Sequence, residues 1–156
     1  MDFEVGAAIG AGLIAGAAMS MLLYMGIGMM PKQMKMNLFL MLGTMMVRDR
    51  PMAYVAGAMM HAVMSIVFGL IHVALFIAFD LEGSVAAWGI VLGLGHWLVA
   101  GMGLGMMPIM HPLIRRGEMQ APGVLARGYP LPTAAGFFML HIVFGVLMRA
   151  LYAAFT

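Results

Sequence analysis

The stretch Ser65-Ile-Val-Phe-Gly-Leu-Ile-His-Val-Ala-Leu-Phe-Ile-Ala-Phe79 returns in altered form as His141-Ile-Val-Phe-Gly-Val-Leu-Met-Arg-Ala-Leu-Tyr-Ala-Ala-Phe155, 76 positions further along the chain. A second segment, Gly26-Ile-Gly-Met-Met-Pro31, returns as Gly103-Leu-Gly-Met-Met-Pro108 with an offset of 77. Segments that repeat in the same order at nearly the same spacing indicate a duplicated structural unit. The sequence therefore predicts a tandem duplication of a two-helix unit.

The composition is typical of a membrane protein. Of the 156 residues, 64% are hydrophobic and 9% are charged, and the mean hydropathy is +1.03. Soluble domains carry about a quarter charged residues, and a spanning helix needs about 20 apolar ones. We therefore predict an all-α membrane protein with one four-helix transmembrane domain over residues 1–156. Its first repeat covers residues 3–79 and its second covers residues 80–155.

The four spans are expected at residues 3–30, 52–79, 85–107 and 133–155. Pro31 and Pro108 are expected to end the first and third spans, because proline lacks the N–H that a helix needs. The chain begins with acidic rather than basic residues, so we expect the first apolar run to be a retained helix and not a cleaved signal peptide.

The connector at residues 32–50 is apolar in its middle and basic at both ends. This pattern predicts a short helix that lies in the plane of the membrane interface. The second connector covers residues 111–132 and contains four prolines.

Small residues recur along the first and third spans. Gly12-Leu-Ile-Ala-Gly16 returns as Gly89-Ile-Val-Leu-Gly93, and Gly101 and Gly105 continue the spacing of four. Glycines at this spacing let the backbones of two helices approach closely in lipid. We therefore expect these glycines to be helix-packing residues, and we expect the first and third spans to pack against each other.

The charged residues indicate the orientation. The two long connectors carry the basic residues Lys32, Lys35, Arg48, Arg50, Arg115, Arg116 and Arg127, and the opposite side carries Asp2, Glu4, Asp80 and Glu82. Basic connectors face the cytoplasm. Both termini are therefore predicted outside, with the two repeats in parallel topology, in a prokaryotic inner (cytoplasmic) membrane. Arg149, near the end of the last span, is expected to snorkel to the interface or to pair with Asp80 or Glu82.

The chain has 22 methionines and five histidines. Folding the spans about their connectors places His72, His96 and His141 in one layer, with His96 level with about Phe68. Met148 occupies the position of His72 when the repeats are aligned. Thioether and imidazole groups suit copper, so these four residues are a candidate metal site. The alternative is packing, because methionine fills irregular gaps and buried histidine hydrogen-bonds between helices.

Several function classes lack a signature. The chain has no cysteine, which excludes disulfides and thiolate metal sites. The spans contain no carboxylate and no nucleophile motif, so we expect no catalytic residue and no enzyme activity. The net charge of +2 is explained by topology, and neither a nucleic-acid partner nor a soluble small-molecule substrate is expected. No cofactor of its own is expected either, apart from copper under the metal-binding alternative.

Four short motifs resemble a known family. They are Gly43-Thr-Met-Met46 after a Met-Pro-Lys connector, Met60-His61 with Ile66-Val-Phe-Gly69, Gly95-His96-Trp97, and His141-Ile-Val-Phe-Gly145. Together they resemble the uncharacterised four-helix integral membrane proteins of bacteria and archaea that are grouped as a domain of unknown function. The resemblance implies the four-helix fold over nearly the whole chain, and it implies no activity and no site residue.

The sequence thus favours a non-catalytic accessory or structural subunit of a larger membrane complex, in particular an energy-transducing electron-transfer complex of the respiratory or photosynthetic kind. Its expected partners are other integral membrane subunits and lipid, since small and adaptable residues favour contacts between helices. The alternative is a copper- or metal-binding membrane protein that uses methionine and histidine side chains. A small transporter is disfavoured by the absence of charged or broken helices at mid-membrane.

Overall fold

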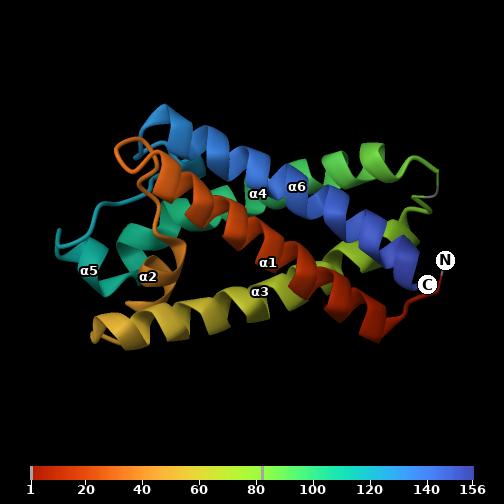
Figure 1. Cartoon of the computed structure of the whole chain (residues 1–156), viewed down its shortest axis with the longest axis horizontal. Helices are drawn as coiled ribbons and strands as arrows, with labels where there is room; N and C mark the ends of the chain where they lie inside the picture. Colours follow the sequence, from red (N-terminus) through yellow and green to blue (C-terminus); the bar gives the residue numbers. More distant parts are fainter. Residues whose placement is uncertain (1, 82) are drawn as a thin grey trace.

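Four long helices dominate the protein, whose computed structural model describes residues 2–81 and 83–156. These residues form helices and connecting segments, with no strand. The long helices are α1 (Val5–Met29), α3 (Arg50–Ala78), α4 (Val85–Met110) and α6 (Leu131–Phe155), which run along the long axis of the molecule (Figure 1). Each is long and apolar enough to cross a membrane. The predicted all-α class with four membrane-length helices is therefore confirmed, and it indicates an integral membrane protein.

The two ends of the molecule differ. Both termini and the turn between α3 and α4 lie at one end, and the two long connectors lie at the other (Figure 1). The connectors contain the short helices α2 (Leu38–Gly43), α5 (Pro112–Arg115) and η1 (Val124–Ala126). The connector end thus holds extra structure beyond the four spans.

The helix ends follow local capping chemistry. Asp49 accepts a hydrogen bond from the Met52 N–H at 3.0 Å and begins α3, and Ser84 accepts one from the Ala87 N–H at 3.3 Å and begins α4. The prediction that Pro108 ends the third span is wrong, because α4 continues to Met110 with this proline in its last turn. Because Pro108 lies so near the end of the helix, its missing N–H removes only a single backbone hydrogen bond.

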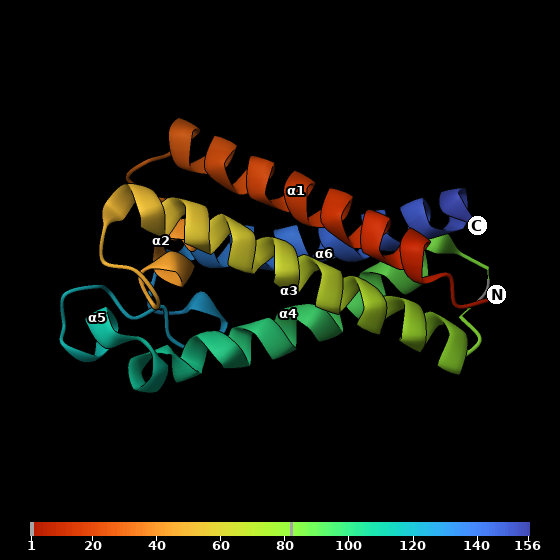
Figure 2. The same cartoon turned by 90° about the horizontal axis from the view of Figure 1, so that it is seen from below.

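The pairing of the long helices differs from the prediction. α1 packs against α3 and α6, and α4 packs against α6. Figure 2 shows α1 and α4 along opposite edges of the molecule, so the expected packing of the first span against the third is wrong. The reason is that each glycine-rich helix packs against the helix with larger side chains in its own half of the chain.

The glycines at these contacts leave no room for a side chain. A Cβ added at Gly12 would meet the Ser65 carbonyl oxygen at 2.5 Å, and Gly16 faces the Ser65 hydroxyl. Across the other pair of helices, a Cβ at Gly89 would meet the Val146 Cα at 2.6 Å, and one at Gly93 would meet the His141 carbonyl oxygen at 2.7 Å. Close backbone approach at small residues is how helices pack where no hydrophobic force drives them together.

Gly101 and Gly105 make a different contact. Added Cβ atoms at these positions would meet the side chains of Leu125 and Val124, which belong to η1. The second half of α4 therefore packs against the second connector rather than against another span.

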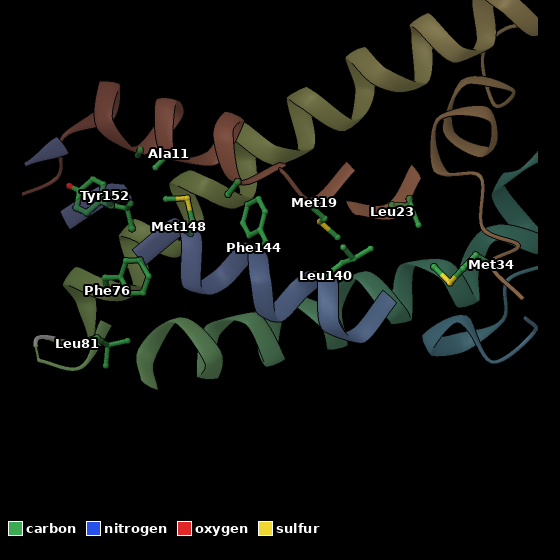
Figure 3. Close-up of a cluster of buried hydrophobic side chains, with 13 residues drawn as sticks. Ala11, Met19, Leu23, Met34, Phe76, Leu81, Leu140, Phe144, Met148 and Tyr152 are labelled. Carbon is green, nitrogen blue, oxygen red and sulfur yellow. The ribbon is translucent and has the colours of Figure 1, made fainter. Parts of the chain in front are cut away.

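The buried core is centred on α6. Phe144, Met148 and Tyr152 of α6 lie beside Phe76 of α3 and Ala11 of α1 (Figure 3). The Tyr152 hydroxyl accepts a hydrogen bond from the Glu4 N–H at 2.9 Å and donates one to the Asp2 carbonyl oxygen at 2.5 Å. These bonds attach the start of the chain to the last helix.

The first connector contains a short helix, as the sequence predicts. Its helical part is limited to α2, whose Met41 and Leu42 are 2% and 4% exposed. α2 packs against α3 so closely that a Cβ at Gly43 would meet the Ala53 carbonyl group. The apolar residues Met41 and Leu42 face the bundle, and the position of α2 in the interface plane stays a prediction.

Arg149 is buried rather than extended into the interface, since 5% of it is exposed. Its guanidinium lies 5.4 Å from the centre of the Phe76 ring and donates a hydrogen bond to the Leu81 carbonyl oxygen at 3.5 Å. The side chain thus bonds to the backbone at the turn after α3. Glu82, one of its two predicted partners, lies outside the described residues.

Candidate functional site

A cavity of about 340 Å³ lies between the four long helices. Its wall is mostly apolar, with Met19 and Leu23 from α1 and Phe144 from α6 among the residues that line it. Met41 and Leu42 of α2 line it as well, and α2 lies at the connector end. The buried position of α2 therefore gives the cavity part of its wall.

The cavity reaches the outer surface of the bundle beside α3 and α4. Met64 of α3 and Val99 and Met110 of α4 all line it, and they are 38%, 58% and 55% exposed. In the described part of the chain, α3 and α4 are not among the helix pairs that pack closely along their backbones. In a membrane an opening at this position lies on the side of the bundle, where it would give a lipid-soluble molecule a lateral route into the cavity.

Histidine rings from three helices meet beside the cavity. The His96 ring of α4 lies 5.5 Å from that of His72 on α3 and 4.7 Å from that of His141 on α6, measured between ring centres. Phe68 stacks on His96 with the ring centres 3.8 Å apart. The structure therefore brings together the three histidines that the sequence placed in one layer. We call His72, His96 and His141 the histidine layer, and His61, eleven residues before His72 on α3, is a further histidine in the cavity wall.

Hydrogen bonds fix the proton position on two of these rings. His141 Nδ1 lies 2.7 Å from the Phe137 carbonyl oxygen, which can only accept, so Nδ1 carries the proton. His61 Nδ1 lies 3.1 Å from Ser20 Oγ, and the Ser20 hydroxyl donates to the Gly16 carbonyl oxygen at 3.0 Å. His61 Nδ1 is then the donor to Ser20. In a neutral imidazole the other nitrogen, Nε2, is an acceptor.

On the remaining two rings, His72 and His96, no hydrogen bond to Nδ1 from the described residues fixes the proton position. His72 Nδ1 and His96 Nδ1 are buried, and neither has a hydrogen-bond partner among residues 2–81 and 83–156. Buried polar atoms are normally hydrogen-bonded, and an exception is a common feature of a functional site or of an unfilled one. His96 also lines the cavity, so its ring is available to a molecule bound there.

The predicted ligands His72, His96, His141 and Met148 fit a metal ion less well than the cavity fits an apolar molecule. In the described residues, no group of three or more histidine, aspartate or glutamate side chains is placed to hold a metal ion. Met148, the fourth candidate ligand, is fully buried and packs in the apolar core with Phe76 and Phe144. Binding of copper by these residues stays a prediction.

Sequence reasoning missed the role of His111, which is fully buried at the end of α4. Its Nδ1 accepts hydrogen bonds from the N–H groups of Leu113 and Ile114, so its Nε2 carries the proton and donates to the Met41 carbonyl oxygen at 2.8 Å. This side chain links the start of α5 to α2. A polar residue directly before a proline at the first position of a helix is the signal that could have revealed the cap.

Sequence reasoning also missed a network of polar side chains that includes Asn37. Its side-chain oxygen accepts from the Leu40 N–H at 3.2 Å and from the Tyr24 hydroxyl at 2.9 Å, and its amide donates to the Tyr54 hydroxyl at 2.6 Å. These bonds hold α2 against α1 and α3 and keep its side chains at the cavity.

Comparison with known proteins adds no further constraint. No protein-family model matches the chain, and no curated protein or solved structure matches it either. The resemblance drawn from the short motifs therefore extends as far as a protein of four membrane-length apolar helices, with no family identified.

Proposed function

We propose that this protein binds a small lipid-soluble molecule in the cavity between its four spans. The observation that carries the proposal is the cavity itself, about 340 Å³ of mostly apolar space with His61, His96 and His141 in its wall. Ligand sites are typically apolar pockets of about 300–1,000 Å³ in which a few convergent polar groups fix the orientation. The opening beside Met64 and Val99 supports a ligand that arrives from the bilayer.

We infer that the protein acts as a non-catalytic accessory subunit of a larger membrane complex, of the energy-transducing electron-transfer kind. Support comes from the outward faces of the spans, where Met21, Met59 and Ile109 are 66%, 66% and 75% exposed. In a membrane such side chains contact either lipid or neighbouring subunits, and methionine adapts well to both. A cavity for a lipid-soluble molecule suits a complex that exchanges electrons through carriers dissolved in the membrane.

We further propose that the fold is a tandem duplication with parallel repeats and both termini outside. The duplication is supported by glycines at corresponding positions of the two repeats, which make corresponding helix contacts. Gly16 of α1 approaches Ser65 of α3, and Gly93 of α4 approaches His141 of α6. These residues correspond to each other at offsets of 77 and 76. Termini at one end and basic connectors at the other agree with this orientation.

The test is gentle solubilisation of native membranes, followed by a native gel and mass spectrometry of the band that contains this chain. We expect a band that also holds redox subunits and an organic extract that contains one enriched lipid-soluble molecule. Gly103 lines the cavity, and a Cβ there would meet no atom within 4 Å. Gly103→Phe should therefore displace the molecule.

The matched control is Gly95→Phe. Gly95 lies on the same helix with nothing within 4 Å of an added Cβ, and it is exposed. This variant should keep the molecule. A chain that migrates alone, with no molecule that Gly103→Phe displaces, would contradict both the subunit and the binding proposals.

Copper binding is the second candidate function, favoured by the gathering of His72, His96 and His141. Imidazole is a common ligand of copper, and the ring centre of His96 lies 5.5 Å and 4.7 Å from those of His72 and His141. The test is the metal content of the purified protein and of the alanine variants of these residues. Equal metal content in all of them would exclude the site.

A further inference from the structure

We propose that the molecule held in the cavity is a lipid-soluble hydroxyl compound whose O–H group donates a hydrogen bond to a histidine in the cavity wall. This inference rests on the proposed binding function and names the class of its ligand. It follows from counting which polar groups along the cavity still have a proton to donate and which have a lone pair to offer.

The two hydroxyl groups in the wall have no proton free. Ser65 Oγ donates to the His61 carbonyl oxygen at 2.8 Å, and Thr133 Oγ1 donates to the Gln33 carbonyl oxygen at 2.6 Å. Both residues line the cavity. Since a hydroxyl has one proton, each can act toward a ligand as an acceptor and not as a donor.

Two of the three histidines in the wall are acceptors as well. His61 and His141 each use Nδ1–H inside the protein, on Ser20 Oγ and on the Phe137 carbonyl oxygen. A neutral ring is the less costly form in apolar surroundings, and in that form Nε2 keeps a lone pair. Neither Nε2 has a hydrogen-bond partner among the described residues. The cavity therefore presents two imidazole acceptors.

His96 is the remaining polar side chain in the wall. Its Nδ1 is buried without a partner in the described part of the chain, and the ring lies 4.7 Å from His141 between ring centres. A neutral His96 can donate one hydrogen bond. A hydroxyl group suits this arrangement, because it can donate to an imidazole acceptor and accept from His96 at the same time.

Other ligand classes fit less well. A ketone or quinone carbonyl can only accept, so it would leave the acceptor nitrogens of both His61 and His141 unpaired, whereas a hydroxyl group pairs one of them, and each buried unpaired polar group is costly. A hydrocarbon would leave all of them unpaired. A charged head group would have to lose its hydration in a wall with no opposite charge among the residues that line it. The donor–acceptor pattern thus selects a neutral hydroxyl compound such as a phenol, a hydroquinone or a fatty alcohol.

The experiment measures binding of three probes to the full chain in lipid nanodiscs. The probes are a 4-alkylphenol, its methyl ether and the alkylbenzoquinone of the same chain length. We expect the phenol to bind about fivefold more tightly than the ether or the quinone, since a hydrogen bond contributes about 1 kcal/mol and 1.4 kcal/mol is a factor of ten. His61→Leu and His141→Leu should each reduce this preference, and Gly103→Phe should abolish binding of all three probes.

The outcomes separate the two proposals. Probes that bind equally well, and whose binding Gly103→Phe abolishes, would overturn the hydroxyl inference and leave the binding function standing. No binding of any probe, or binding that Gly103→Phe leaves unchanged, would overturn the binding function itself. If His141→Leu fails to fold, His61→Leu carries the test, because the His61 ring is only half-buried and its one hydrogen-bond partner among the described residues is Ser20.

Discussion

His96 of α4 stacks on Phe68 of α3 with ring centres 3.8 Å apart and ring planes inclined by 18°. This contact joins two helices whose backbones do not pack closely, and it lies at the inner edge of an opening to lipid. Because the His72 and His141 rings also approach His96, the stack sets the position of the whole histidine layer. The aromatic contact therefore holds the polar end of the cavity in place.

The glycine contact between α4 and α6 gives the first prediction. A Cβ at Gly145 would meet the Gly89 carbonyl oxygen and, at 2.8 Å, the Gly93 Cα. Gly145→Ala should therefore lower the free energy of unfolding by about 1–3 kcal/mol, the usual cost of overpacking. Unfolding of the purified protein in mixed micelles with increasing sodium dodecyl sulfate measures it.

The matched control for this change is Gly95→Ala, because an added Cβ there meets no atom within 4 Å. It should leave stability unchanged or raise it by up to about 1 kcal/mol, since alanine favours helix more than glycine does. Equal effects of the two substitutions would mean that α4 and α6 are not in close contact.

The link between His111 and α2 gives the second prediction. His111→Ala leaves the Met41 carbonyl oxygen without its 2.8 Å hydrogen bond and removes the cap of α5. We expect a loss of about 1–3 kcal/mol, the cost of an unsatisfied buried group. Hydrogen exchange should show faster exchange in α2 (Leu38–Gly43). Arg115→Ala, an exposed position on the same short helix, is the control and should leave exchange in α2 unchanged.

The depth of the histidine layer could be predicted from sequence, whereas the helix pairing could not. Counting residues from the turn near Leu81 places His96 level with Phe68, since both helices rise by the same 1.5 Å per residue. Glycine spacing, by contrast, shows that some helix approaches closely without showing which one. Gly12 and Gly93 therefore indicated close contacts correctly and gave the wrong partner for each helix.

The cavity and the burial of α2 could not be predicted from the sequence, for a related reason. An apolar stripe such as Met41 and Leu42 has the same pattern whether it faces lipid or the protein interior. What decides between them is a set of distant polar contacts, with His111 in one connector and Tyr24 and Tyr54 in two different spans. A single sequence does not show that such residues meet.

His72 gives a third prediction, which concerns the stability of the protein. Its Nδ1 is buried without a partner in the described residues, and Phe76 and Phe144 pack against its ring. His72→Phe replaces the ring by an apolar one of similar shape, so it should raise the free energy of unfolding by about 1–3 kcal/mol. His141→Phe should not, because it removes the bond to the Phe137 carbonyl oxygen.

The same unfolding assay compares the two histidine variants. A clear loss of stability in His72→Phe would show that the His72 nitrogen has a partner in the folded protein, for which a bound metal ion is the first candidate. Metal analysis of the same samples would then follow.

The orientation of the protein in the membrane gives the fourth prediction. It can be tested with single introduced cysteines, because the chain has none of its own. Single cysteines at Thr156 and Gly117 report on opposite ends of the bundle, and both positions are exposed. Because Arg115 and Arg116 directly precede Gly117, that end should face the cytoplasm. A membrane-impermeant maleimide added to intact cells should therefore label the cysteine at position 156, and it should label the one at position 117 only after the cells are opened. Labelling in the reverse order would place the basic connectors outside and would mean that the charge distribution does not set the orientation of this protein.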